Sequence, residues 1–171
     1  MSGRVTLVLG GARSGKSRYA EGLIAALPPP WGYVATAEAR DDEMIARIAA
    51  HRARRGPPWK TVEAPHEIAE AIVLCQPMPV LVDCLTLWLS NMMLAGSDID
   101  AEAGRFERAL QAAAAPVVLV ANEVGSGIVP EFPLGRKFRD LQGTLNQRIA
   151  ARADRVVLMV AGLPLAVKGA P

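Results

Sequence analysis

The chain has 171 residues, of which 51% are hydrophobic, and this length suffices for one domain with a full core. The formal net charge is only +2, and there is no basic tract or aromatic ladder, so the composition does not favour nucleic-acid binding. Every apolar run is shorter than the roughly 18 to 20 residues that cross a bilayer, so we expect no transmembrane segment.

Apolar runs typical of buried strands alternate with segments of helical periodicity along the chain. This alternation predicts an α/β fold, with a mostly parallel central sheet flanked by helices, and residues 1–171 as a single domain. The predicted strands are residues 4–9, 32–36, 59–63, 79–83, 116–121 and 155–160, with a possible short C-terminal edge strand at 163–167. The predicted helices are residues 16–27, 41–55, 66–75, 85–94, 100–114 and 135–152.

The first predicted strand is followed by a glycine-rich loop that matches the phosphate-binding pattern G-x-x-x-x-G-K-[ST]. Strand, loop and helix together form the context that this motif requires, so the fold is predicted to be P-loop NTPase-like. We expect Lys16 to reach the outer phosphates of a nucleotide and the Ser17 hydroxyl to ligate Mg²⁺. The predicted loop comprises Gly10, Gly11, Ala12, Arg13, Ser14, Gly15, Lys16 and Ser17.

Acidic residues follow two of the predicted strands. Asp83 comes directly after an apolar run, and a P-loop needs such an acid at a neighbouring strand end to hold the metal shell. The alternative is that Asp83 caps the following helix. Glu123 follows the strand at 116–121 at the same sheet edge, so it competes with Asp83 for the metal or acts on the substrate.

The predicted helix at 41–55 begins with acids and ends with cations, as the helix dipole favours. Arg47, His51, Arg54 and Arg55 are spaced to share one face. Such a face attracts phosphates and disfavours the imidazolium form, which would leave a ring nitrogen as a nucleophile. A solvated surface histidine is the alternative. The other histidine, His66, is expected to have a surface or capping role.

Two cysteines, Cys75 and Cys84, lie in apolar surroundings without the spacing of metal ligands. The chain also runs straight into its first strand without a charged and apolar leader. We therefore expect a reducing, cytoplasmic setting. Cys84 follows Asp83 and is either a buried structural thiol or a neighbour of the site.

Three segments carry a resemblance to a known family: GGARSGKSRYAE from residue 10, DDEMIARIAAHRARRGPPWKTVE at 41–63 and NEVGSGIVPEFPLGRKFRDLQGTLNQRIAARAD at 122–154. Together they resemble the bifunctional adenosylcobinamide kinase/adenosylcobinamide-phosphate guanylyltransferases of cobalamin biosynthesis. The first segment is shared with many NTPases, whereas the other two are specific to this family. The resemblance covers nearly the whole chain.

The resemblance implies two reactions. The aminopropanol hydroxyl of adenosylcobinamide takes a phosphoryl group from ATP or GTP in the presence of Mg²⁺. A histidine then attacks the α-phosphate of GTP, pyrophosphate leaves, and the GMP passes to adenosylcobinamide phosphate. By its position in the motif the histidine is His51, with Lys16 as the second catalytic residue. Relatives of this kind are homotrimers, so a homo-oligomer is expected.

The resemblance also implies a set of nucleotide-binding positions. Thr36 and Glu38 would meet the ribose or base, Arg54 and Arg55 would neutralise departing pyrophosphate, and Glu63 would accept from guanine. Some relatives have a second histidine at the position that Ala50 occupies in this chain, and some have glutamate at the position of Asp83. Besides residues 10–17, the set comprises Thr36, Ala37, Glu38, Arg52, Ala53, Arg54, Arg55, Glu63 and Asp83.

Two other functions remain open at this point. A simple P-loop metabolite kinase would use Lys16, Ser17 and Asp83 without a histidine intermediate, and a nucleotide-dependent regulatory module would use the loop as a switch. For the corrinoid ring, the aromatic candidates are Trp31, Trp59 and Trp88, each of which is equally a core residue.

Overall fold

The computed structural model describes residues 4–39 and 41–169, with the side chain of Arg47 outside the described part. Seven strands form one sheet. The strands are β1 (Val5–Gly10), β2 (Trp31–Ala35), β3 (Trp59–Glu63), β4 (Val80–Asp83), β5 (Val117–Asn122), β6 (Arg155–Val160) and β7 (Leu163–Lys168). The helices are α1 (Lys16–Ala25), α2 (Asp42–Ala53), α3 (Ile68–Cys75), α4 (Leu85–Leu94), α5 (Ile99–Ala112) and α6 (Pro133–Arg152).

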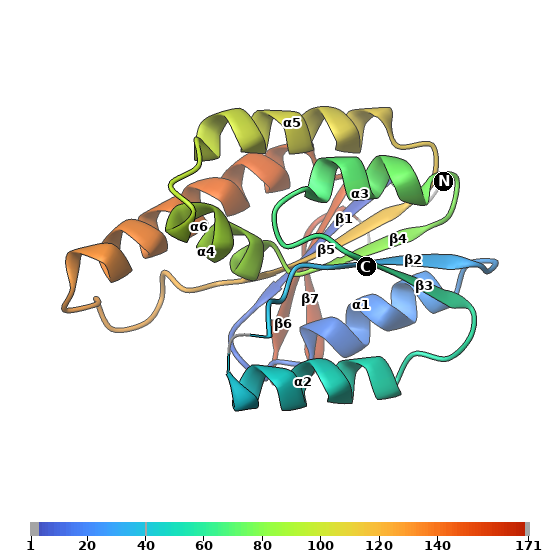
Figure 1. Cartoon of the computed structure of the whole chain (residues 1–171), viewed down its shortest axis with the longest axis horizontal. Helices are drawn as coiled ribbons and strands as arrows, with labels where there is room; N and C mark the ends of the chain where they lie inside the picture. The colour runs from blue at the N-terminus through green and yellow to red at the C-terminus, as the bar shows by residue number, and fades with distance from the viewer. Residues whose placement is uncertain (1–3, 40, 170–171) are drawn as a thin grey trace.

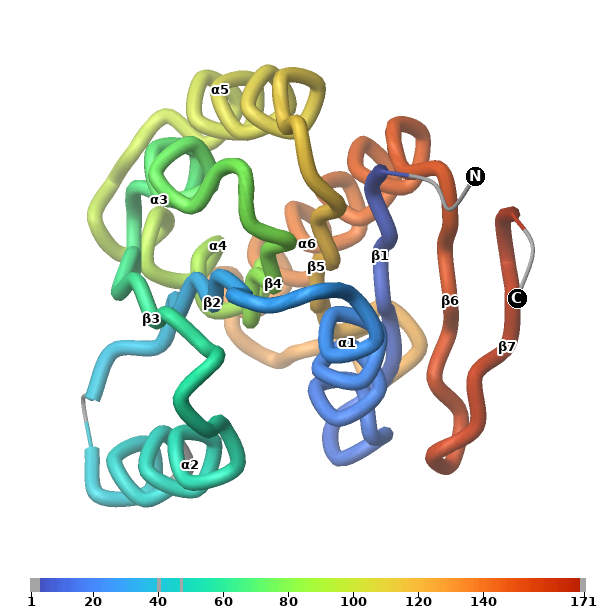
Figure 2. The backbone as a smooth tube through the Cα atoms, turned by 90° about the vertical axis from the view of Figure 1, so that its right-hand side faces the viewer, coloured from blue at the N-terminus to red at the C-terminus, as the bar shows by residue number. Residues whose placement is uncertain are grey.

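The strand order is β3-β2-β4-β5-β1-β6-β7, and only β7 runs antiparallel to its neighbour. Figure 2 shows the two edges of the sheet, with β3 at one side and β7 at the other. The central strands are buried almost throughout, which explains their continuous apolar sequences. The prediction of a mostly parallel α/β fold is confirmed.

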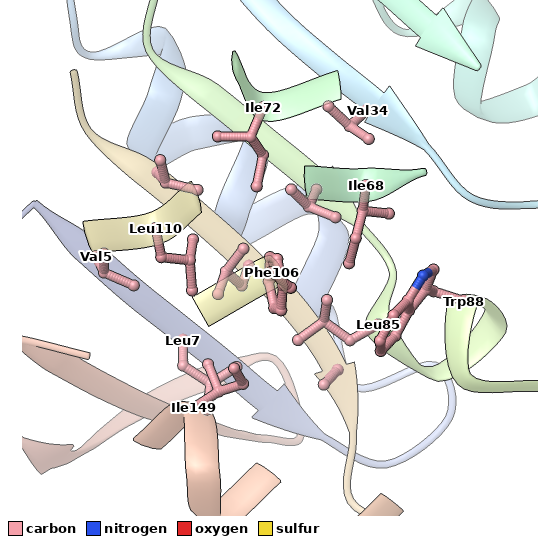
Figure 3. Packing of buried hydrophobic residues seen from close by; sticks show 14 of the residues in the cluster. Val5, Leu7, Val34, Ile68, Ile72, Leu85, Trp88, Phe106, Leu110 and Ile149 are labelled. Carbon is pink, nitrogen blue, oxygen red and sulfur yellow. The ribbon is translucent and has the colours of Figure 1, made fainter. Parts of the chain in front are cut away.

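Helices cover both faces of the sheet (Figure 1). The helices α1 and α2 lie on one face, and α3, α4, α5 and α6 lie on the other. The larger core lies under the four-helix layer, where Phe106 and Trp88 pack with ring centroids 6.0 Å apart (Figure 3). A smaller core joins α1 to the opposite face of β1, β2 and β4.

The ends of several elements differ from the predicted ones. The sixth helix starts at Pro133, two residues before the predicted start, because proline suits the first helical position, where its missing N–H is no loss. The second helix ends at Ala53, so Arg54 and Arg55 lie at and beyond its C-cap. Its start is fixed by the Asp41 side chain, which accepts a hydrogen bond from the backbone N–H of Met44. The predicted edge strand is real and is six residues long.

The carboxyl ends of the parallel strands meet at one edge of the sheet. In the strand register, Gly10 pairs with Asn122 and Ala35 pairs with Asp83. The P-loop and the predicted acid therefore leave the sheet at the same edge, where open α/β sheets bind ligands. No helix among the described residues is long and apolar enough to cross a membrane.

Candidate active site

Glycine shapes the loop between β1 and α1 at two positions. Gly10 has a φ of +155°, and a Cβ atom there would lie 2.6 Å from Ser14 Oγ and 2.8 Å from the carbonyl oxygen of Met159. Gly15 has a φ of +91° and is the N-cap of α1. Both backbone conformations are ones that side chains with a Cβ resist. The loop can therefore turn tightly enough to direct backbone N–H groups and the helix N-terminus towards a phosphate.

The lysine of the loop is folded inward. Its side chain is buried, and Nζ donates a hydrogen bond of 2.6 Å to the carbonyl oxygen of Gly11 and lies 3.5 Å from Ser14 Oγ. Lys16 thus lies across the loop that would hold the phosphates. Of the other loop residues, Gly10 is buried and Ser14 and Ser17 are partly buried, whereas Gly11, Ala12, Arg13 and Gly15 are exposed.

Asp83 is the centre of the site. Its Oδ2 accepts a hydrogen bond of 3.0 Å from the hydroxyl of Tyr33 and lies 3.5 Å from His51 Nδ1. Burial raises the cost of ionising this carboxyl, but the hydrogen bonds from His51, Ser17 and Tyr33 lower its pKa below the ordinary value. A carboxylate that stays ionised therefore joins the P-loop serine to the histidine.

His51 reaches Asp83 from the last turn of α2, and both residues belong to one chain. Because Nδ1 faces the carboxylate, the pair favours the tautomer with a proton on Nδ1 and a lone pair on Nε2. The imidazole is half-buried and lines a cavity. This is the arrangement that a nucleophilic histidine needs, with one nitrogen held and the other available.

Three arginines surround the end of α2, and each contacts a glutamate. Arg54 donates to both carboxylate oxygens of Glu21 on α1, at 3.2 and 3.4 Å. Arg52 forms an exposed ion pair with Glu63. This ion pair uses part of the hydrogen-bond accepting capacity of the Glu63 carboxylate, which the N–H groups of guanine would need.

Arg55 is the most buried of these arginines, with only 5% of its side chain exposed. Its Cζ lies 3.4 Å from the centroid of the Tyr33 ring, and Nη1 lies 4.0 Å from Glu21 Oε1. Neither Nε nor Nη1 has a hydrogen-bond partner. Burial and the charge of Asp83 raise the pKa of Tyr33, so its hydroxyl remains a donor.

A cavity of about 660 Å³ is lined by Tyr33 and by the charged and polar groups around Asp83. Its lining changes along α2, from the apolar Met44, Ile45 and Ile48 near the helix start to His51 and Arg55 near its end. The rest of the wall includes Ser17, Ala37, Glu38, Glu63, Asp83, Cys84 and Leu87. An elongated ligand with one apolar and one anionic end fits such a wall.

Not every residue of the predicted set lines the cavity. The Thr36 hydroxyl is buried below it, where it donates to the carbonyl oxygen of Cys84 at 2.8 Å and accepts from the Cys84 N–H at 2.7 Å. The side chain of Ala53 is exposed on α2. Thr36 therefore fixes the end of β4, next to Asp83.

The residues predicted to hold Mg²⁺ lie together, because Ser17 forms a hydrogen bond to Asp83. Hydroxyl and carboxylate oxygens suit this ion, which also takes oxygens from nucleotide phosphates and water. Among residues 4–39 and 41–169, no group of three or more His, Cys, Asp or Glu side chains could hold a metal by itself.

Glu123, the rival acid, is used within its own loop. Its carboxylate accepts hydrogen bonds from the backbone N–H groups of Gly125 at 2.8 Å and Ser126 at 3.3 Å.

Cys84 lies at the cavity wall, and burial together with the charge of Asp83 raises its pKa to about 11. The thiol is therefore protonated at neutral pH and unsuited to be the nucleophile.

The tryptophans proposed for the corrinoid differ in access. Trp88 is fully buried and donates to the carbonyl oxygen of His66. Trp31 donates to the carbonyl oxygen of Leu27. Trp59 lines a second cavity of about 460 Å³ beside the first, so it is the most accessible of the three to a ligand.

Sequence reasoning missed Tyr33 and Glu21. Tyr33 lies inside an apolar strand and Glu21 inside a helix whose sequence gives no functional signal. Only the three-dimensional arrangement shows that each contacts a charged group from a distant segment.

A model of the family described as cobinamide kinase / cobinamide phosphate guanyltransferase matches residues 6–167. The chain belongs to this family. It is 46% identical to the bifunctional adenosylcobalamin biosynthesis protein CobP of Pseudomonas aeruginosa, over 96% of this chain and 98% of the relative. It is 43% identical to the bifunctional adenosylcobalamin biosynthesis protein CobU of Salmonella typhimurium, over 95% and 98%. The expected family is confirmed, and with it an enzyme that combines kinase and guanylyltransferase activities.

More distant solved structures share the fold of this cobinamide kinase / cobinamide phosphate guanyltransferase family member. An ATPase of a type III secretion system has a TM-score of 0.55 at 11% identity, covering 95% of this chain and 56% of the ATPase. The RadB recombinase has a TM-score of 0.52 at 16% identity, covering 90% and 73%. At these identities the likeness concerns the fold alone.

The two hydrogen bonds of Thr36 predict a stability difference between two small substitutions. Thr36→Val keeps the shape but leaves the N–H of Cys84 unpaired, whereas the Cys84 carbonyl still accepts from the Trp88 N–H, so the free energy of unfolding should fall by about 2 kcal/mol. Thr36→Ser keeps the hydroxyl and should lose only about 1 kcal/mol. Urea denaturation measures both. Equal stability of the two variants would contradict the structural role of the hydroxyl.

Proposed function

We propose that the enzyme phosphorylates the aminopropanol hydroxyl of adenosylcobinamide with ATP or GTP and then transfers GMP from GTP to the product. The transfer passes through a guanylyl group on His51, and the products are adenosylcobinamide-GDP and pyrophosphate. The observation that carries the proposal is the position of His51 against Asp83, which also bonds the P-loop residue Ser17. One carboxylate thus links the triphosphate loop to the nucleophile.

In the first reaction the substrate hydroxyl attacks the γ-phosphorus, and the bond to the bridging oxygen of the nucleotide breaks. The loop between β1 and α1 binds the phosphates, and Lys16 neutralises charge on the transferring group. Mg²⁺, held by Ser17 and Asp83, would supply further charge neutralisation. The hydroxyl proton passes to solvent or to the product phosphate.

In the second reaction Nε2 of His51 attacks the α-phosphorus of GTP, and pyrophosphate leaves. An oxygen of adenosylcobinamide phosphate then attacks the same phosphorus, and the nitrogen–phosphorus bond breaks. Asp83 stabilises the charge that develops on the imidazole when Nε2 forms its bond. Arg55 carries a fixed positive charge at the cavity wall, so it is suited to stabilise phosphate oxygens during both displacements.

The proposal takes the whole chain as one catalytic domain, because all seven strands join a single sheet. The free thiols of Cys75 and Cys84 fit a cytoplasmic setting.

We also propose a homotrimer. The apolar Leu163, Leu165 and Val167 lie on one face of the edge strand β7 and are more than half exposed, a surface that another copy would cover.

Covalent labelling tests the guanylyl intermediate. Incubated with GTP labelled at the α-phosphate and Mg²⁺, without corrinoid, the enzyme should acquire label in an acid-labile, alkali-stable form and release pyrophosphate. His51→Ala should abolish the label. His66→Ala is the matched control, because it removes the other histidine of the chain, and it should label normally.

Two results would contradict this route. Absence of label in the wild-type enzyme at every Mg²⁺ concentration would exclude a stable covalent intermediate, and label retained in His51→Ala would place it on another residue. Corrinoid-dependent loss of the γ-phosphate in an enzyme that never labels would leave a simple kinase.

Lys16→Ala should reduce both reactions by about a hundredfold or more, because a cation that stabilises developing charge is lost from a shared phosphate loop. The measurements are corrinoid phosphorylation and the initial rate of guanylyl labelling. Arg18→Ala is the control, since Arg18 is exposed on the same helix. Normal guanylyl labelling in Lys16→Ala would place the GTP of the second reaction outside the P-loop.

Sedimentation equilibrium tests the trimer. The wild-type particle should have about three times the 18.2 kDa mass of one chain. Leu165→Lys should dissociate it, because a charge would be buried at the contact, whereas Val73→Lys on the exposed side of α3 should not. A monomeric wild type would overturn the proposed assembly.

A further inference from the structure

Tyr33 contacts two groups of opposite charge with two different parts of its side chain. The hydroxyl donates to Asp83 Oδ2 at 3.0 Å, and the ring face supports the Arg55 guanidinium, whose Cζ lies 3.4 Å from the ring centroid. The residue itself is 4% exposed and comes from the buried strand β2. Tyr33 is not among the site residues that the sequence predicts.

Arg55 and Asp83 form no ion pair with each other, although both are largely buried at the same cavity. This separation requires an explanation, because a buried guanidinium with unpaired N–H groups is costly and a nearby carboxylate would satisfy it. Among the residues that the structure describes, the carboxylate in contact with Arg55 is that of Glu21, whose Oε1 lies 4.0 Å from Nη1. Cation–π contact with the ring replaces part of the missing stabilisation.

We infer that Tyr33 is a positioning residue that keeps Arg55 from pairing with Asp83. Its ring holds the guanidinium by the face at the wall of the cavity, so the charge stays where phosphate oxygens would enter. Its hydroxyl holds the carboxylate beside Ser17 and His51. Without the ring, the two charges would neutralise each other and neither would serve the nucleotide. This inference rests on the proposed function, in which Arg55 receives phosphate and Asp83 serves His51.

A double-mutant cycle on GTP binding tests the inference. Isothermal titration calorimetry with GTP in EDTA measures phosphate binding without the metal. Tyr33→Leu should weaken GTP about tenfold, as much as Arg55→Met, because the freed guanidinium pairs with Asp83. In an Asp83→Asn background the same substitution should cost only about twofold, since the amide no longer competes for Arg55.

Tyr33→Phe separates the two contacts of the side chain. It keeps the ring, so the affinity for metal-free GTP should stay within about twofold of wild type. It loses the hydrogen bond to Asp83, so the rate constant of guanylyl labelling at saturating GTP should fall about tenfold. A simply destabilised variant would not show this division between binding and rate.

Several outcomes would overturn the inference: wild-type GTP affinity in Tyr33→Leu, an equal loss in the Asp83→Asn background, or a tenfold loss of affinity in Tyr33→Phe. Tyr33→Met provides a second ring-free variant if Tyr33→Leu does not fold, as judged by circular dichroism. Failure of the proposed function is seen separately, as absence of guanylyl label in the wild-type enzyme.

Discussion

The buried carboxylate of Asp83 is the interaction on which the site depends. It is held at the end of β4 by the hydrogen bonds between the Thr36 hydroxyl and the backbone of Cys84, and it receives contacts from Ser17, Tyr33 and His51. An ionised carboxylate at this depth is tolerable only because several donors surround it. Those donors come from three separate segments, so one charge fixes the relative positions of the P-loop, β2 and α2.

This constraint explains how one sheet edge can serve attack at two phosphorus atoms. The glycine-rich loop binds a triphosphate in the way that its backbone conformation dictates, whichever phosphate reacts. In the proposed reactions the first nucleophile arrives with the substrate, whereas the second would be His51, which lies beside Asp83. The loop with Lys16 would then act as a common clamp, and the choice of reaction would depend on which nucleophile approaches the nucleotide.

The sequence predicted those parts of the site that follow from local pattern. The P-loop has a fixed spacing, and Asp83 ends an apolar strand, so the parallel sheet brings the two to one edge. The positions of strands and helices could also be predicted, because the periodicity of apolar residues is likewise a local pattern. The roles of Tyr33 and Glu21 could not be predicted, because they arise from contacts between α1, β2 and the end of α2, which no local pattern encodes. The burial of the Thr36 hydroxyl depends likewise on a neighbouring strand.

The central claim is that Asp83 holds Nδ1 of His51 and leaves Nε2 to form the bond to phosphorus. Nuclear magnetic resonance of the guanylylated enzyme, with ¹⁵N-labelled histidine, measures this directly through the coupling between nitrogen and phosphorus. The phosphorus is expected to couple to Nε2 of His51. Coupling to Nδ1 would contradict it, because the carboxylate could not then orient the nucleophile in the way the structure shows.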